Sequence, residues 1–343
     1  EIRNELESKG HQFKLHSDTE VILHAYKEWG VNCVNRFIGM FSFAILDKGK
    51  GELLLFRDRA GVKPLYYYQN EKTFIFASEL KEMYVHPQFH KQIDMEAVAL
   101  YFKFGYVPAP HAIFQGVRKL MPGHYLKYNI KRRTFTIHQY WNVMDFYEKP
   151  KLKISYNEAK DELRNILKSA FEYRMVADVP VGVFLSGGYD SVGVTAMLQK
   201  DRTEKLKTFT IGFPVGNNEA PVAKEIAHYL DTEHTEYICT YNDCREILPN
   251  LSFYYDEPFS DNSAVPTILV SQLARQKVKV ALSADAGDET FAGYNSYVSL
   301  AKVLKFMKPI KHVKSSFLSN VIEEANKMVS PYSFLRDKVE YFG

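Results

Sequence analysis

Residues 184–198 read FLSGGYDSVGVTAML, a stretch in which an apolar run leads into a helix-like pattern. The apolar run VPVGVFL (residues 179–185) predicts a buried strand, and the pattern that follows SGGYDS is typical of a helix. Helical segments alternate with three further predicted strands, namely KTFTIGF, TEYICT and VKVALS. This alternation predicts a parallel sheet covered by helices on both faces. In such sheets ligands bind at the carboxyl ends of the strands, and SGGYDS lies at such an end.

Residues 186–191, SGGYDS, combine residue types suited to a phosphate group. Gly187 and Gly188 let the backbone approach a bulky anion, and successive N–H groups at the start of a helix predict an anion-binding nest. The hydroxyls of Ser186 and Ser191 suit phosphate oxygens, whereas Asp190 would repel a bare phosphate. We therefore expect a Mg²⁺ ion to bridge Asp190 and the phosphates, because carboxylate oxygens are the hard ligands that this ion prefers.

The same stretch has a structural interpretation that needs no ligand. It is a glycine-rich turn in which Asp190 or Ser191 serves as the N-cap of the following helix. The stretch is neither a Walker loop, since no G-K-S/T follows, nor a G-x-G-x-x-G fingerprint. Gly193 costs about 1 kcal/mol inside a helix, so its presence predicts close contact between that helix and the sheet.

Three carboxylates follow the predicted strand VKVALS within five positions, at Asp285, Asp288 and Glu289. The topology predicts that they lie on the same edge of the sheet as SGGYDS. This placement favours a Mg²⁺ site shared between Asp190 and Asp288, with Asp285 available to contact a substrate amine or to act as a base. The alternative is a solvated acidic loop that caps the next helix.

Residues 217–230, NNEAPVAKEIAHYL, predict one of the helices of this half of the chain. Pro221 falls in the first turn, where its missing N–H is not needed. The apolar spacing predicts a single packing face made of Val222, Ile226, Tyr229 and Leu230.

Residues 1 to about 140 have a different texture. Runs such as MFSFAILD and GELLLFRD alternate aromatic and branched residues with polar ones, which predicts antiparallel strands. SDTEVILHAYKEWG predicts a helix with a capping box between Ser17 and Glu20 and a stop at Gly30.

Length and composition agree with about two globular domains in 343 residues, 46% of them hydrophobic. The net charge of +3 does not favour nucleic acid as a partner, and no apolar run is long enough to span a membrane. The three cysteines lack metal-ligand spacing, so we expect no zinc site, a reducing cytoplasmic setting and a core position for Cys33. The expected boundaries are a first domain at 1–142, a charged linker at 143–155 and a second domain at 156–343.

The motifs together resemble a known family. SGGYDS is similar to the pyrophosphate-binding loop of the ATP-pyrophosphatase (PP-loop) enzymes, and ALSADAGDETFAGY is similar to the LSGDGGDE-FGGY stretch of asparagine synthetases. TFTIGF and YYDEPFSDNSAVPT also agree with that family. The resemblance implies a doubly wound parallel-sheet ATP-pyrophosphatase domain. Tyr189, Ala284 and Ala286 depart from the family pattern, which leaves the acceptor substrate open.

The resemblance also implies the roles of individual residues. It implies that Asp285 is important for forming or using an acyl-adenylate and that Asp190 and Asp288 hold Mg²⁺. It implies ATP binding by Leu185, Ser186, Gly187, Gly188, Asp190, Ser191, Ile211, Ser283 and Ala284.

The first half resembles the glutaminase domain of the same family through GHQFKLHSDTEVILHAYKEWG, RDRAGVKPLYY and YVPAPHAIFQGVRKLMPGHYL. The fold implied is the N-terminal-nucleophile (class II glutamine amidotransferase) αββα sandwich, in which an N-terminal cysteine attacks glutamine. Residue 1 is Glu, so we expect a fragment that is truncated at the N-terminus and has no glutaminase activity. Asp18 matches a residue that binds the α-amino group of glutamine, and helix capping beside Ser17 is its structural alternative.

The implied activity is an ATP-dependent amidotransferase of the glutamine-hydrolysing asparagine synthase type. The partners would be small molecules, namely glutamine, ATP with Mg²⁺ and aspartate, without nucleic acid or membrane, and family analogy adds a homodimer. Family motifs expected near the C-terminus do not occur before Gly343, so we expect truncation there and nucleotide binding with little or no turnover. Two alternatives stay open. One is amidation of a sugar carboxylate in surface-polysaccharide synthesis, and the other is an inactive nucleotide-binding regulator.

Overall fold

The computed structural model describes residues 1–214, 216 and 218–307. The chain divides into two units, the first from Glu1 to Ser283 and the second beginning at Ala284. Residues 308–343 lie outside the described residues. They include the end of the predicted second domain, where the C-terminal truncation was expected. Among the described helices, none combines the length and apolar character needed to cross a membrane.

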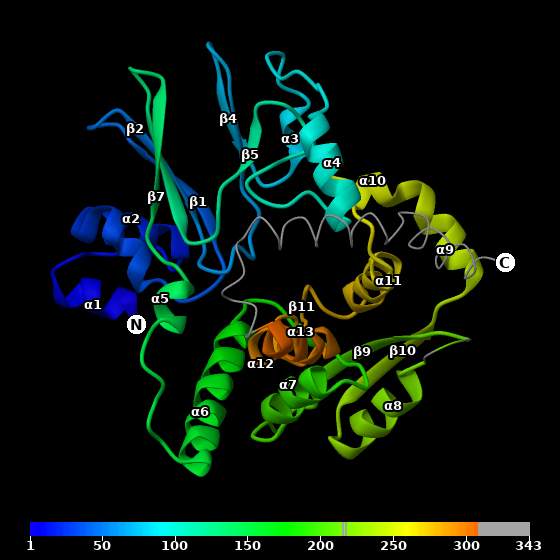
Figure 1. The fold of residues 1–343 in the computed structure, drawn as a ribbon. Helices are drawn as coiled ribbons and strands as arrows, with labels where there is room; N and C mark the ends of the chain where they lie inside the picture. Colours follow the sequence, from blue (N-terminus) through cyan, green and yellow to red (C-terminus); the bar gives the residue numbers. More distant parts are fainter. Residues whose placement is uncertain (215, 217, 308–343) are drawn as a thin grey trace. The chain divides into compact units, whose positions relative to one another are not determined.

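Two antiparallel sheets form the first part of the chain, as the alternating pattern predicts (Figure 1). One sheet has the order β1-β2-β6-β7 and the other has the order β4-β3-β5. Their strands are β1 (Ser42–Asp47), β2 (Glu52–Arg57), β3 (Tyr66–Gln69), β4 (Phe74–Ala77), β5 (Val117–Lys119), β6 (His124–Asn129) and β7 (Thr134–Gln139).

Neighbouring side chains of these strands point to opposite faces, so that both sheets bury two faces. Leu54 and Phe56 of β2 pack in a cluster with α1 (Ile2–Ser8), α2 (Asp18–Trp29) and the 3₁₀ helix η1 (Gly30–Arg36), which contributes the buried Cys33. Leu55 points the other way and shares a cluster with Tyr67 of β3, between the two sheets. Tyr68 lies on the remaining face with α3 (Leu80–Met83) and α4 (Met95–Phe104). The core position expected for Cys33 is confirmed, and burial raises the pKa of its thiol to about 11.

The helix predicted at residues 17–30 is present as α2, but only half of its predicted capping box forms. The Ser17 side chain accepts a hydrogen bond from the backbone of Glu20, and Gly30 ends the helix. The carboxylate of Glu20 does not return to Ser17; it accepts hydrogen bonds from the N–H groups of Lys14 and Leu15, at 2.8 and 2.7 Å. The preceding loop offers two donors at close range, and the carboxylate satisfies those instead.

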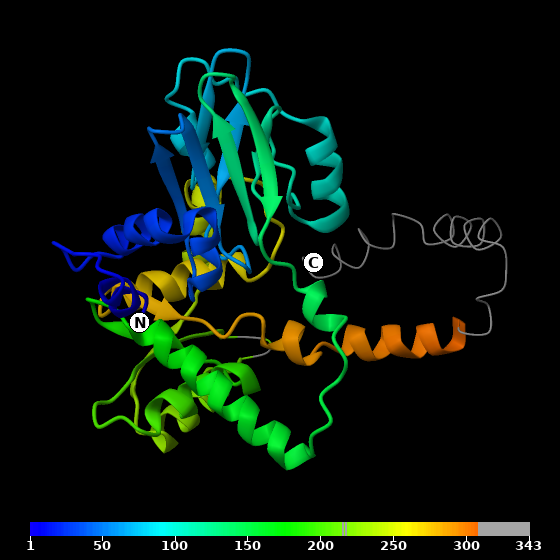
Figure 2. The same cartoon turned by 90° about the vertical axis from the view of Figure 1, so that its left-hand side faces the viewer.

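Four parallel strands form the third sheet, in the order β10-β9-β8-β11. The long green helix in Figure 2 is α6, which precedes this sheet in the chain. The four-residue α5 (Met144–Tyr147) lies inside the predicted linker, and α6 begins with a complete capping box between Ser155 and Glu158. Helices α7, α8 and α11 pack against the strands. The bounds are α6 (Tyr156–Met175), β8 (Val181–Phe184), α7 (Tyr189–Gln199), β9 (Lys207–Gly212), α8 (Ala220–Tyr229), β10 (Glu233–Ile238), α9 (Tyr241–Ile247), η2 (Leu248–Asn250), α10 (Leu251–Tyr254), α11 (Ala264–Arg275) and β11 (Val280–Leu282).

Helix α8 forms where predicted, with Pro221 in its first turn, but it packs through another face. Its buried residues are Ala220, Ala223 and Ala227, whereas Tyr229 is 87% exposed. Ala220 meets the end of β9 at Gly212, where an added Cβ would lie 2.7 Å from the Ala220 Cβ. The predicted apolar stripe at Val222, Ile226, Tyr229 and Leu230 is therefore wrong as the main packing face, because small side chains let this helix approach the sheet closely.

The second unit contains α12 (Gly287–Phe291) and α13 (Asn295–Met307) within the described residues. Asp288 and Glu289 lie in the first turn of α12, where negative charge is favourable next to the helix dipole.

Candidate active site at the carboxyl edge of the parallel sheet

Three neighbouring strands of the parallel sheet end together and carry predicted site residues. Val183 of β8 pairs with Leu282 of β11, so the residues that follow these strands emerge side by side. Phe184 pairs with Phe209 of β9, which places Ile211 at the same edge. The structure thus brings residues 185–191, Ile211 and Ser283 to one edge of the sheet, as predicted. Leu185 is buried against α8, and its backbone N–H donates to the Phe209 carbonyl at 2.9 Å.

The loop between β8 and α7 is held by its own serines. Ser191 Oγ lies 2.9 Å from Ser186 Oγ and accepts a hydrogen bond from the Ser186 N–H at 3.0 Å. Ser186 Oγ in turn accepts from the Gly188 N–H at 3.1 Å. Both hydroxyls therefore fix the shape of the loop. Gly188 is the N-cap of α7, so the alternative in which Asp190 or Ser191 caps the helix is wrong.

A carboxylate already contacts the loop at the predicted anion nest. Glu219, the residue before α8, accepts a hydrogen bond from the Gly187 N–H at 3.2 Å. One N–H group of this loop therefore faces a negatively charged oxygen, and the nest of successive N–H groups stays a prediction. Sequence reasoning did not single out Glu219. Its position in the loop after the neighbouring strand β9 could have identified it, because the loops that follow adjacent parallel strands lie at the same edge of the sheet.

Gly193 does not have the role that the sequence predicted for it. A Cβ added to Gly193 would meet nothing within 4 Å, so no close contact between α7 and the sheet requires glycine here. The requirement for glycine lies instead at the end of β9, at Gly212, as described above.

Asp190 is half-buried in the first turn of α7, and Tyr189 beside it is 97% exposed. No hydrogen bond or ion pair of the Asp190 side chain occurs within the part of the chain that the structure describes. A half-buried carboxylate without a protein partner suits a hard cation. No cluster of three or more His, Cys, Asp or Glu side chains able to hold a metal occurs among the described residues. Further ligands for a cation at Asp190 would thus have to come from substrate oxygens or water.

The acidic loop belongs to the second unit, which begins at Ala284. Ala286 has φ of 75°, in the left-handed region that favours glycine, and it is the N-cap of α12. Asp288 fills the space that a Cβ on Gly293 would need. Glu289 accepts a hydrogen bond from the Tyr294 hydroxyl at 3.0 Å. Asp285 is exposed, whereas Ala284 and Asp288 are half-buried. The residue at the N-cap position of α12 is Ala286 and not an acidic residue.

Asp18 lies far from these motifs in sequence and is the first residue of α2, exposed to solvent. Ser17 provides the side-chain cap of α2, so capping by Asp18 is wrong as its structural role.

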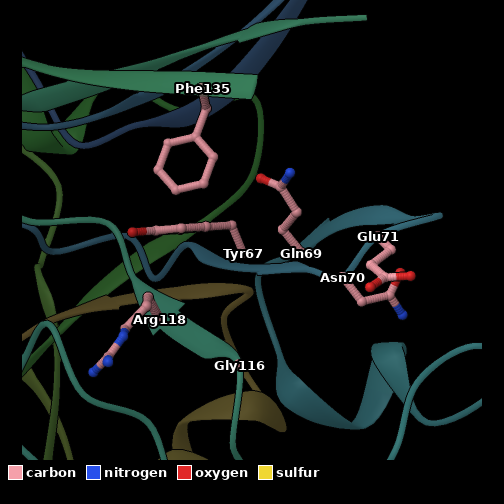
Figure 3. Close-up of a pocket in the computed structure, with 7 residues that line it drawn as sticks. All are labelled: Tyr67, Gln69, Asn70, Glu71, Gly116, Arg118 and Phe135. Carbon is pink, nitrogen blue, oxygen red and sulfur yellow. The ribbon is translucent and has the colours of Figure 1, made fainter. Parts of the chain in front are cut away.

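A separate cavity of about 430 Å³ opens in the first half of the chain (Figure 3). The rings of Tyr67 and Phe135 meet edge to face in it, with centroids 5.4 Å apart. Gln69 donates from Nε2 to the Arg133 carbonyl at 2.8 Å, while its buried Oε1 has no partner within the described residues. None of the predicted site residues lines this cavity. Its lining is Tyr67, Gln69, Asn70, Glu71, Gly116, Arg118 and Phe135.

Comparison with known proteins adds independent findings. A glutamine amidotransferase domain model matches residues 1–141, and an asparagine synthase model matches residues 162–336, just over half of the chain. A protein of Methanocaldococcus jannaschii described as putative asparagine synthetase [glutamine-hydrolyzing] 2 is 39% identical over 326 residues, which cover 90% of this chain and 62% of that protein. Asparagine synthetases [glutamine-hydrolyzing] 1 and 3 of Bacillus subtilis are 34% and 30% identical, and the matches cover 96% and 86% of this chain.

This chain spans half of each Bacillus relative and about three-fifths of the Methanocaldococcus one. The match to the synthase model includes the loop after β8, the end of β9 and the acidic stretch after β11. The chain therefore belongs to the asparagine synthase family, with a glutamine amidotransferase domain ahead of the synthase domain.

Proposed function

We propose that this chain is the central part of an ATP-dependent carbon–nitrogen ligase, an asparagine synthase of the glutamine-hydrolysing type. Such an enzyme adenylates the side-chain carboxylate of aspartate and amidates it with ammonia taken from glutamine. The observation that carries the proposal is the loop after β8, whose Gly187 N–H binds a carboxylate at the edge where three parallel strands end. Family membership supplies the reaction type.

The proposed organisation follows the sequence-based boundaries. Residues 1–142 form an N-terminal-nucleophile αββα domain, 143–155 form a linker, and 156–343 form a doubly wound ATP-pyrophosphatase domain. Two packed antiparallel sheets with helices on their outer faces support the first assignment. A four-stranded parallel sheet supports the second. Asp18 is the proposed contact to glutamine.

ATP would lie along the carboxyl edge of the parallel sheet. Its phosphates would bind the loop N–H groups, and Asp190 and Asp288 would hold a Mg²⁺ ion that neutralises the charge of the leaving pyrophosphate. Fixed N–H dipoles that point at developing negative charge commonly supply the largest share of an enzyme's rate enhancement. The proposed nucleotide contacts are Leu185, Ser186, Gly187, Gly188, Asp190, Ser191, Ile211, Ser283 and Ala284. Asp285 is the proposed catalytic carboxylate for forming or using the acyl-adenylate.

Amidation of a sugar carboxylate is the second candidate. The nearly complete exposure of Tyr189 favours it, because an aromatic ring beside the nucleotide loop could stack on a sugar. Pyrophosphate release by the protein completed at both ends distinguishes the two. It would be measured with ATP, Mg²⁺ and ammonia, first against aspartate and then against a uronic-acid sugar. Release with aspartate alone supports asparagine synthesis. Release only with the sugar means that the acceptor is a sugar carboxylate and not aspartate. Release with neither contradicts the proposed ligase.

A further inference from the structure

Residues 253–260, from the end of α10 into the loop before α11, contact the amidotransferase half of the same chain, and we call them the docking segment. Ser260 donates its N–H to the Gly105 carbonyl at 2.7 Å. Asp256 Oδ2 accepts from the Leu80 N–H at 2.6 Å, and Lys81 Nζ donates to the Phe253 carbonyl at 2.7 Å. One backbone–backbone hydrogen bond and two bonds between a side chain and the backbone therefore hold the segment at the start of α3 and the end of α4.

Glu257 is the centre of this contact. Its carboxylate forms an ion pair with Lys119 of β5, accepts a hydrogen bond from the Ile113 N–H at 2.8 Å and lies 3.5 Å from the Tyr66 hydroxyl. The Lys119 and Glu257 side chains are only 15% and 11% exposed. Lys119 also donates to the Val107 carbonyl at 2.5 Å. Burial and the Glu257 charge both raise the pKa of the Tyr66 hydroxyl, so that this group stays neutral and donates to the carboxylate.

Opposite charges face each other across the contact, although Lys81 also pairs with Glu79 of its own half at 3.1 Å. Asp256 and Glu257 are consecutive acids from the synthase half, and Lys81 and Lys119 are the two amines that face them. Lys81 Nζ lies 3.5 Å from Asp256 Oδ1. A buried charge without its partner is costly, so the largely buried pair of Lys119 and Glu257 favours one register of the docking segment.

The docking segment leads directly to the sheet edge. The chain continues from the docking segment into α11, which packs on β9 and β11. Strand β11 ends at Leu282, the residue before Ser283. Helix α11 therefore connects the docking segment to β11, and the proposed nucleotide contact Ser283 follows that strand. Shifting the docking segment would displace this edge relative to the amidotransferase half.

We propose that Glu257 is a positioning residue that, through Lys119, couples the two reactions by holding the amidotransferase half in register with the synthase edge. The inference rests on the proposed function, since coupling requires ammonia made in one half to be used in the other. Glu257 need not touch substrate for this role.

The test compares Glu257→Gln, Lys119→Gln and Lys119→Arg in the protein completed at both ends. Glu233→Gln is the matched control, because it breaks the 3.2 Å pair with Lys277 inside the synthase half. With glutamine as donor, we expect Glu257→Gln and Lys119→Gln to lose at least tenfold in product formation and to release more than one glutamate per product. With ammonia as donor, product formation should change less than twofold. Lys119→Arg keeps the charge and should keep coupling.

Equal loss with both donors, or coupling unchanged in Glu257→Gln and Lys119→Gln, overturns the proposal. If Glu257→Gln does not fold, the Lys119→Gln and Lys119→Arg pair decides. Hydrogen exchange of the Ile113 amide in residues 1–343 tests the docking role of Glu257 separately from the proposed ligase function, because this measurement needs no activity. Faster exchange in Glu257→Gln than in Glu233→Gln supports the docking role even if the proposed ligase fails, whereas unchanged exchange overturns it.

Discussion

At the scale of single residues, Glu219 decides how a nucleotide would meet the loop after β8. Its carboxylate takes the Gly187 N–H that a phosphate oxygen would need. Two negative groups near one donor repel each other by about 1 kcal/mol at contact distance in water. The nucleotide must therefore displace Glu219 or tolerate it nearby.

We predict that Glu219→Gln strengthens nucleotide binding roughly fivefold, the equivalent of about 1 kcal/mol at the stated Coulomb scale. Calorimetric titration of ATP into the chain measures this change. Glu225→Gln, an exposed position on the same helix, is the control and should change nothing. Weaker binding in Glu219→Gln would mean that this carboxylate helps to bind the nucleotide, through a metal or directly. That result would contradict a competition between Glu219 and a phosphate oxygen for the Gly187 N–H.

At the scale of secondary structure, strand β10 carries a histidine in an unusual setting. His234 Nδ1 lies 2.9 Å from the Thr208 hydroxyl on β9, and its buried Nε2 has no partner within the described residues. Burial lowers the pKa of this imidazole from its ordinary value of 6.5. The neutral form is thus the one that fits the edge of the sheet.

A base whose pKa falls on folding binds fewer protons in the folded than in the unfolded state. Its contribution to stability is complete above pH 6.5 and is lost as the pH falls through the lowered pKa. We predict that the free energy of unfolding decreases between pH 7.5 and pH 5 and that His234→Asn flattens this slope. Urea unfolding at several pH values tests it, with His16→Gln, an exposed histidine, as the control. An unchanged slope in His234→Asn would contradict the assignment.

The elements also show how far the sequence could be used for prediction. Strands, helices and the common edge of β8, β9 and β11 follow from apolar periodicity and right-handed crossovers. The packing face of α8 did not follow, because a hydrophobic pattern weighs Val and Tyr above Ala, whereas close packing at Gly212 selects small side chains. The capping box of α2 and the N-cap of α7 depended on competing local donors, which residue types alone do not reveal.

At the scale of the whole molecule, the contacts that sequence patterns could not predict are those between distant segments. Glu219 meets Gly187 across two loops, and Glu257 meets Lys119 across the two halves of the chain. Both contacts form between loops or strands that only the folded sheets bring close together. The resemblance to a family predicted which loops matter, and the structure adds which carboxylates contact them.

ATP binding to residues 1–343, measured with and without Mg²⁺, tests whether the loop after β8 is the nucleotide site. We predict that Mg²⁺ strengthens binding and that Asp190→Asn abolishes this gain with a loss of about tenfold, or ~1.4 kcal/mol. Asp178→Asn, an exposed aspartate before β8, should behave as the unmodified chain. If ATP does not bind, or if Asp190→Asn binds Mg²⁺ and ATP as the unmodified chain does, the loop after β8 is not the nucleotide site and the account is contradicted.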